Sequence, residues 1–241
     1  MLEAALNQVL EAQSESGKPL GIIMAGHNGS GKSTMWRDHL SERLEIPLVN
    51  ADRMMLSILP EVDDLLELPA WAVGLRDRNN AWMGVAQRGV EAFVAQAMIQ
   101  QVPFAMETVF SYWEVQPDGT FRSKIDKIRE LQQGGYFVLL CFVGLSNSDL
   151  SVARVLTRVM AGGHNIDEPK LRARFPRTQA AISQAITVAD AAILVDNSVG
   201  EEEAFSVCRV QLGDRLLYDL RDEEPQLPWV NEWLDVIAPG R

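Results

Sequence analysis

The stretch from Gly26 to Ser33 reads GHNGSGKS and fits the pattern G-x-x-x-x-G-K-[ST] at every fixed position. Glycines let the backbone of such a loop curl until successive N–H groups point at phosphate oxygens. The lysine then reaches the β- and γ-phosphates, and the serine hydroxyl is placed to bind Mg²⁺ between them. We therefore expect ATP or GTP, with Mg²⁺ on Ser33, to be held by Gly26, His27, Asn28, Gly29, Ser30, Gly31, Lys32, Ser33 and Thr34.

The sequence on either side of this loop distinguishes two interpretations of the motif. One is a phosphate-binding loop, and the other is a glycine-rich turn that contains a lysine by chance. The apolar run GIIMAG at 21–26 precedes it and a helical stretch follows, which is the context that the motif requires. No Asn-Lys-x-Asp segment for reading guanine follows a later strand, and no long apolar strand ends in Asp-Glu as in ATP-driven motors. The sequence therefore favours a small-molecule kinase that uses ATP.

Acidic residues follow two other apolar runs, where the carboxyl ends of parallel strands gather ligands. Asp52 comes after IPLVN at 46–50, and Glu107 with Thr108 comes after VPFAM at 102–106. Asp52 is placed to accept the proton of an acceptor hydroxyl, although it could instead cap the helix that starts near Arg53. Glu107 could orient the substrate or hold a Mg²⁺-bound water, and its alternative is a buried ion pair.

Positive charge for the transferred phosphoryl group is expected from five arginines around Gly162-Gly163-His164. They are Arg154, Arg158, Arg172, Arg174 and Arg177. Two arginine-bearing helices joined by glycines would form a lid over residues 151–178, with His164 positioning it. Any one of these arginines could instead be a solvated charge, so the pattern alone leaves open which of them touch phosphate.

The elements that must position these residues alternate along the chain. Short apolar runs, among them YFVLLCFVGL at 136–145 and AAILVD at 191–196, lie between helical stretches at roughly 32–44, 80–101, 121–133, 148–160 and 168–187. This alternation predicts a three-layer α/β/α fold with a mostly parallel sheet of five or six strands. A hairpin and helix at about 204–238 are expected as an appendage, and Pro176 is expected to kink or split its helix. We expect one domain over 1–241.

Composition limits the partners. The chain has 241 residues, 47% of them hydrophobic, and a formal net charge of -11. This acidic balance argues against binding nucleic acid or an anionic membrane, since both need a basic surface. Cys141 and Cys208 show neither a disulfide framework nor a metal spacing, so we expect reduced thiols in a cytoplasmic protein.

Taken together, several segments resemble the zeta toxin family of P-loop kinases. These are AGHNGSGKST, NAD at 50–52, METVFS at 106–111, SVARVLTRVMAGGHNI at 151–166, Arg174, and ILVDNS at 193–198. The resemblance implies that Lys32 and Ser33 hold ATP and Mg²⁺ and that Asp52 acts as the base. It also implies that Glu107, Thr108 and Ser111 contact the substrate and that Arg158 and Arg174 grip phosphates.

The same resemblance implies a UDP-N-acetylhexosamine as the acceptor, a toxin role, and an antitoxin protein as the partner. No family motif is found between Asp52 and Glu107, where a sugar nucleotide would be recognised. Two other hypotheses therefore stay open. One is a kinase of another small hydroxyl compound without a toxin role, and the other is a nucleotide-dependent binding module without catalysis.

Overall fold

The computed structural model describes residues 1–63, 67–78, 80–115, 117, 121–163, 166–200, 203–225 and 227–239. Its strands are β1 (Leu20–Gly26), β2 (Leu48–Val49), β3 (Phe104–Thr108), β4 (Trp113–Val115), β5 (Phe121–Ser123), β6 (Phe137–Gly144), β7 (Ala191–Asp196), β8 (Ser206–Leu212) and β9 (Arg215–Asp219). Its helices are α1 (Leu2–Ser16), α2 (Lys32–Met35), the π-helix η1 (Trp36–Leu40), α3 (Ser41–Leu44), α4 (Ala51–Leu56), α5 (Ala70–Arg78), α6 (Asn80–Gln100), α7 (Ile125–Gln133), α8 (Ser148–Met160), α9 (Glu168–Ala185), the 3-10 helix η4 (Leu220–Asp222) and α10 (Pro228–Ile237).

One large sheet has the strand order β2-β3-β1-β6-β7-β8-β9. The first five strands run parallel, as the apolar runs predict, and β1 and β6 are buried along their whole length. The predicted C-terminal hairpin is present, but it is not an appendage: β8 pairs antiparallel with β7, so the hairpin extends the sheet to seven strands. The predicted mostly parallel α/β fold is thus confirmed.

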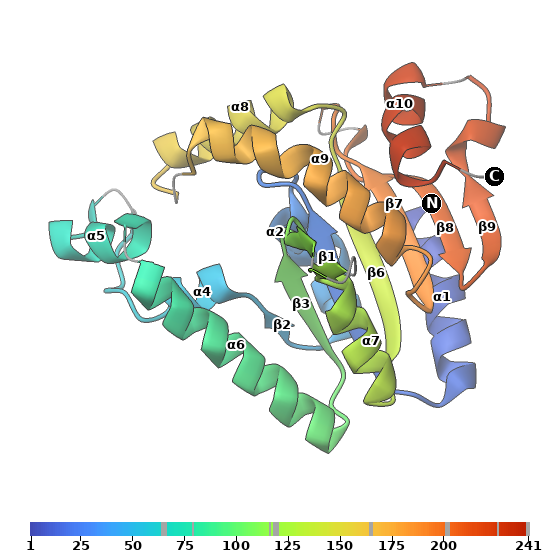
Figure 1. The fold of residues 1–241 in the computed structure, drawn as a ribbon, viewed down its shortest axis with the longest axis horizontal. Helices are drawn as coiled ribbons and strands as arrows, with labels where there is room; N and C mark the ends of the chain where they lie inside the picture. Colours follow the sequence, from blue (N-terminus) through green and yellow to red (C-terminus); the bar gives the residue numbers. More distant parts are fainter. Residues whose placement is uncertain are drawn as a thin grey trace.

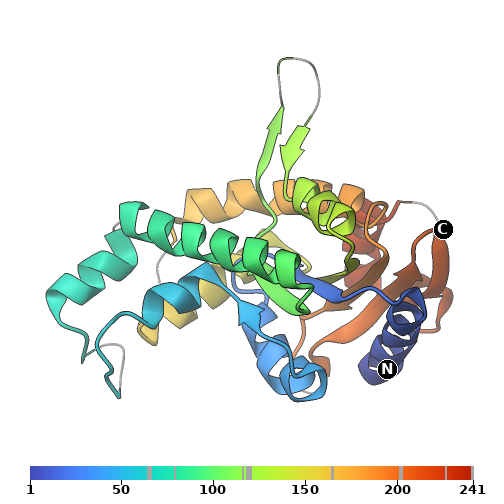
Figure 2. The ribbon, with the colours of Figure 1, turned by 90° about the horizontal axis from the view of Figure 1, so that it is seen from below.

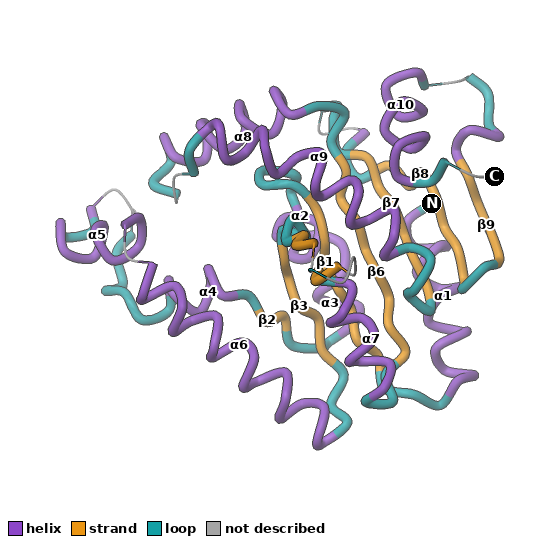
Figure 3. The backbone as a smooth tube through the Cα atoms, in the orientation of Figure 1, coloured by secondary structure: helices purple, strands orange, loops and turns teal. Residues whose placement is uncertain are grey.

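Helices cover both faces of this sheet, and β1 shows how the faces divide (Figures 1 and 2). Ile23 and Ala25 face a core formed with α6, α7, α9 and α10, whereas Ile22 and Met24 face a core formed with α1 and the helices after the phosphate loop. Alternating side chains of one strand thus enter two separate cores. This is the expected three-layer arrangement, visible in Figure 3 as a layer of strands between helices.

Three segments differ from the pattern-based expectation. The helix predicted at 121–133 begins only at Ile125, because Ser123 Oγ accepts from Ile125 N at 3.1 Å and Asp126 accepts from Ser123 N at 3.1 Å. Strands β4 and β5 precede it as a small antiparallel sheet that projects from the body (Figure 2). Helix α5 lies outside the helical stretches predicted from the sequence, and α9 passes through Pro176 as one helix.

Two further features of the fold are the state of the cysteines and the length and polarity of the helices. Cys141 and Cys208 are both free and buried. Across the described ranges, every helix is too short or too polar to cross a bilayer.

Candidate active site

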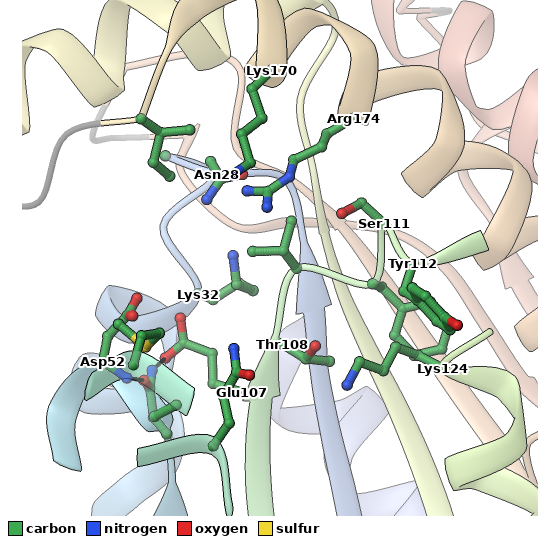
Figure 4. A pocket seen from close by; sticks show the side chains of 18 of the residues that line it. Asn28, Lys32, Asp52, Glu107, Thr108, Ser111, Tyr112, Lys124, Lys170 and Arg174 are labelled. Atoms are coloured by element: carbon green, nitrogen blue, oxygen red, sulfur yellow. Dashed lines mark hydrogen bonds between the residues drawn. The ribbon is translucent and has the colours of Figure 1, made fainter. Parts of the chain in front are cut away.

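A cavity of about 930 Å³ lies where the carboxyl ends of β1, β2 and β3 meet α5, α8 and α9. Parallel sheets collect ligands at this edge. Of the residues predicted to act, the cavity is lined by Asn28, Gly29, Lys32, Asp52, Glu107, Thr108, Ser111, Arg158 and Arg174 (Figure 4). The fold therefore brings together side chains from five separate segments of the chain.

The phosphate loop between β1 and α2 requires glycine at two tightly packed positions. Gly26 has φ +157°, and a Cβ there would lie 2.6 Å from Ser30 Oγ and Val143 O. Gly31 has φ +93°, and a Cβ there would lie 2.6 Å from Asn197 Nδ2. The loop is tied to its neighbours, since Asn197 Nδ2 donates to Ser30 O at 2.8 Å. A loop fixed this closely presents its backbone to phosphate in one shape.

Lys32 lies at the start of α2, with its ammonium donating to Gly26 O at 3.2 Å and to His27 O at 2.9 Å. Burial lowers the pKa of Lys32; the carboxylate of Glu107 opposes this shift, Arg158 adds to it, and Asp52 opposes it more weakly. These charges all act on one ammonium group. Lys32 is therefore at the centre of the charged residues of the site.

Glu107, near the carboxyl end of β3, contacts the serine of the phosphate loop. Ser33 Oγ donates to the two carboxylate oxygens at 3.0 and 2.9 Å, and Asn50 Nδ2 donates to Oε2 at 2.7 Å. Within the described part of the chain, these hydrogen bonds are the contacts found for the Glu107 side chain, and its charge acts on Lys32. A hydroxyl and a carboxylate side by side are oxygen ligands of the kind that Mg²⁺ prefers.

Asn50, not Asp52, caps the helix that follows β2. Its Oδ1 accepts from Asp52 N at 2.7 Å and Arg53 N at 3.3 Å, and α4 begins at Ala51. The alternative that Asp52 is the cap is therefore wrong, and its carboxylate faces the cavity (Figure 4). Asn50 is itself buried, and it connects the backbone of Asp52 to Glu107 and through it to Ser33.

Replacing Asn50 with alanine should remove the cap of α4 and a donor to Glu107 together. We expect unfolding to become easier by about 1–2 kcal/mol and kcat of phosphoryl transfer to fall about ten- to hundredfold through misplacement of Asp52 and Glu107. Asn147→Ala is the matched control, because Asn147 caps α8 by accepting from Leu150 N at 2.9 Å. Denaturant unfolding and steady-state kinetics should show similar stability losses but a much smaller kcat loss in the control. Equal kcat losses would contradict the positioning role.

Three arginines of α9, Arg172, Arg174 and Arg177, are candidates for contacting phosphate, and they lie in different environments. Arg172 is paired with Asp149 at 2.5 Å and Glu168 at 2.8 Å, and Arg177 Nε donates to Ala173 O at 2.8 Å. Arg174 lines the cavity together with Arg158 of α8. Burial lowers the pKa of Arg174, the charge of Arg177 adds to this, and Asp52 opposes it. Arg174 is therefore the one of the three that faces the cavity.

His27 is part of the loop predicted to hold the nucleotide, but it does not line the cavity. Its ring stacks on Phe175 of α9, with centroids 3.9 Å apart and planes 10° apart. Burial, and then the charge of Lys32, lowers the pKa of His27 to about 3, so the ring stays neutral. The stack fixes the phosphate loop against the helix that carries Arg174. His164 lies outside the described residues.

Comparison with known proteins identifies the group to which this arrangement belongs. The model of the zeta toxin family matches residues 4–199. This chain belongs to the zeta toxin family. The match covers the phosphate loop and every cavity-lining residue named above, and it ends before β8. The resemblance expected from the motifs is thereby confirmed.

This zeta toxin family member is similar to other proteins in sequence and to several solved structures in fold. An uncharacterised protein of Haemophilus influenzae is 27% identical over 154 residues, covering 64% of this chain and 91% of that protein. The native AvrRxo1-ORF1:AvrRxo1-ORF2 complex is similar with a TM-score of 0.60 at 13% identity, over 98% of this chain and 72% of that one. A structure from the PezAT toxin–antitoxin system of Streptococcus pneumoniae is similar with a TM-score of 0.51 at 12% identity. The similarity covers 96% of this chain and 85% of that one. At these identities the structures indicate a shared fold.

Several cavity residues were missed by the sequence interpretation. They are Asn50, Arg76, Asp77, Tyr112, Lys124 and Lys170. The position of Asn50 between a strand and a helix is a recognisable N-cap signal. Arg76 and Asp77 form an ion pair at 2.8 Å, and Arg76 Nη1 also donates to Gly162 O, which joins α5 to the turn after α8. No local pattern marks the others, because the fold alone brings their segments to the cavity.

Proposed function

We propose that this chain is a kinase that transfers the γ-phosphate of ATP to a hydroxyl of a small metabolite, with a UDP-N-acetylhexosamine as the acceptor. The observation that carries the proposal is one cavity lined by Lys32, Asp52 and Glu107, whose carboxylate also accepts from Ser33 Oγ. Its volume of about 930 Å³ is at the upper end of the range of small-molecule sites. Family membership supports a phosphotransferase of the P-loop kinase type.

ATP and an antitoxin partner are further parts of the proposal. The AvrRxo1-ORF1:-ORF2 complex has been crystallised with ATP, and the PezAT protein comes from a toxin–antitoxin system. We infer the same kind of nucleotide for this chain, a toxin role held in check by a protein antitoxin, and a cytoplasmic location. Residues 1–241 would act as one kinase domain.

The residues divide the work of transfer as follows. Lys32 would hold the β- and γ-phosphates, and Ser33 with Glu107 would hold Mg²⁺, which neutralises phosphate charge when bound. Asp52 would accept the proton of the acceptor hydroxyl as it attacks phosphorus. Arg158 and Arg174 would stabilise the negative charge on the transferred group.

The arginine-bearing segment 151–178 would serve as the lid. Its two helices are fixed to the phosphate loop, since Ser151 Oγ donates to Asn28 O at 2.7 Å and Phe175 stacks on His27. Closure would therefore involve the far ends of α8 and α9, around Gly162, where Arg76 already makes contact. A lid anchored this way carries Arg174 at its fixed end, close to the phosphates.

Phosphoryl transfer is tested by incubating the protein with Mg²⁺, ATP and a panel of UDP-sugars, free sugars and nucleosides. Mass spectrometry should show one added phosphoryl group on a UDP-N-acetylhexosamine, and the Lys32→Ala protein should show none. If no acceptor gains phosphate while ATP still binds, the kinase proposal fails and a nucleotide-dependent binding module becomes the better account. Growth arrest on expression that Lys32→Ala relieves tests the toxin role separately.

A further inference from the structure

Helix α6 presents to solvent a face that carries very little charge. Two of its 21 residues are charged, Arg88 and Glu91, whereas α7 carries four charged residues among nine. Val85 is 48% exposed and Ile99 is 77% exposed. Figure 2 shows α6 along the near side of the molecule, with no described helix or strand lying across it. In so acidic a chain, an exposed helical face with this little charge indicates a contact surface.

The residues at the centre of this face follow a heptad spacing, in which steps of four and three residues alternate. The opposite side of α6, which includes Val94 and Ala97, is buried in the core. A period of 3.5 residues on one face is the pattern by which two helices pack along a common line. The core uses only the buried side, so the fold of one chain does not account for this second stripe. We call it the outer seam, and it consists of the exposed residues Ala81, Val85, Arg88, Ala92, Ala95 and Ile99.

The outer seam is complementary to itself when a second copy of α6 runs antiparallel to it. A twofold axis at the level of Val90 would set each of its larger side chains against an alanine of the second copy. Large residues that face small ones let two helices approach closely and interdigitate. A partner of unrelated sequence would require no such match within one helix. The facing pairs would be Ile99 with Ala81, Val85 with Ala95, and Arg88 with Ala92.

The two charged residues of α6 match across the same axis. Arg88 lies on one side of the level of Val90 and Glu91 on the other, so each Arg88 would lie beside Glu91 of the second copy. Two arginines and two glutamates would then form a neutral cluster at the centre of the contact. A parallel pair of helices would instead set like charges side by side, which is unfavourable. The charges therefore favour the same antiparallel arrangement as the side-chain sizes.

Apolar side chains continue on one flank of the outer seam. Phe93, one turn beyond Gly89, is exposed, and so is Met54 of α4. Met54 lies against α6, since a Cβ at Gly89 would be 2.8 Å from its Cε. With a rise of about 1.5 Å per residue, the 21 residues of α6 span about 31 Å, close to the diameter of a small domain. The seam and this flank thus offer a second copy a long apolar strip.

We propose that this chain forms a twofold-symmetric homodimer in which the outer seams of two α6 helices pack antiparallel. Each contact would occur twice, as an isologous interface requires. The proposal does not depend on the proposed kinase function. Met83 and Gln87 of α6 line the cavity from the other side of the helix, because residues two apart point about 200° apart. The dimer would therefore leave both cavities open and would support the helix that forms one of their walls.

Sedimentation equilibrium of the full chain tests the dimer. At about 100 μM the unmodified protein should have twice the mass of one chain, as for a dimer with a dissociation constant of about 1 μM. Ala92→Arg should raise this constant at least about tenfold, because it sets a bulky cation against Arg88 of the second copy. Gln100→Arg is the matched control: it adds the same charge to an exposed position of α6 outside the seam. It should change the constant by no more than about twofold, and unchanged circular dichroism will show that both variants are folded.

Reversing the charges one at a time gives a result that a role within one chain cannot produce. Arg88→Glu would gather four carboxylates at the axis, and Glu91→Arg would gather four guanidinium groups, so each variant should be monomeric. Mixed in equal amounts, the two variants should form a heterodimer, because its central cluster is neutral again. Native mass spectrometry separates the mixed dimer from either homodimer if one variant carries an affinity tag.

Three results would overturn the proposal. The first is a monomeric unmodified protein, which would leave the outer seam to a partner protein of different sequence. The second is a dimer that Ala92→Arg leaves intact or that Gln100→Arg weakens equally. The third is a mixture of Arg88→Glu and Glu91→Arg proteins that stays monomeric. None of these results bears on phosphoryl transfer, so the dimer and the kinase proposal can fail separately.

Discussion

Replacing Asp52 with asparagine is expected to lower kcat of phosphoryl transfer by about 10²- to 10⁴-fold while ATP affinity stays nearly unchanged. Asparagine keeps the size of the side chain and leaves the backbone N–H of residue 52 bonded to Asn50. The substitution removes only the ability to accept a proton. The loss should therefore fall on the chemical step, and single-turnover measurements with a bound ATP analogue as the affinity control will show whether it does.

Asp77→Asn is the informative comparison for this prediction. Asp77 lines the same cavity, but its carboxylate is already paired with Arg76 at 2.8 Å. A paired carboxylate is a weaker proton acceptor, because the arginine stabilises its ionised form. We expect a smaller loss of kcat than in Asp52→Asn. A larger loss in Asp77→Asn, or full turnover in Asp52→Asn, would move the base assignment away from Asp52.

Removing the guanidinium group of Arg174 is expected to lower kcat more than Asp52→Asn does, by about 10³- to 10⁵-fold in Arg174→Ala. Arg174 lines the cavity, and its charge and that of Asp52 act on each other. A guanidinium placed there would stabilise the charge on the transferred phosphoryl group more strongly in the transition state than in the ground state. Arg174→Lys should recover part of the loss, since it restores the charge without the planar fork.

Arg177→Ala provides the matched control for Arg174. Arg177 is on the same helix, three residues away, but its guanidinium donates to Ala173 O and does not line the cavity. Its loss should change kcat by no more than about twofold, as is usual for solvated helix charges. Comparable losses in the two variants would show that general positive charge on α9, rather than the placement of Arg174, drives the reaction.

The phosphate loop and the parallel sheet could be read directly from the sequence. The spacing of the glycines and Lys32 is a local constraint, because Lys32 donates to Gly26 O and His27 O, six and five residues before it in the chain. Apolar runs such as AAILVD at 191–196 identify buried parallel strands, since both faces of these strands are covered. The two strands β4 and β5 escaped this reading because each has three residues, too few for a period to emerge.

The placement of the hairpin depended on tertiary structure. The alternation around Gly213-Asp214 predicts two paired strands, but not the strand that they pair with next. Pairing of β8 with β7 turned a local hairpin into the edge of the main sheet. Long-range pairing of this kind leaves no trace in a local pattern.

The partners of the site residues were likewise decided only by the fold. Ser33 and Glu107 are 74 residues apart, and Asn50 and Glu107 are 57 apart, yet both pairs are hydrogen-bonded. The sequence determined that Lys32 and Ser33 form a phosphate loop and that carboxylates follow the neighbouring strands. Only the packed structure decided that Arg174 rather than Arg172 or Arg177 faces the cavity, because successive helical residues point about 100° apart and burial of Leu171 and Phe175 sets the rotation of α9.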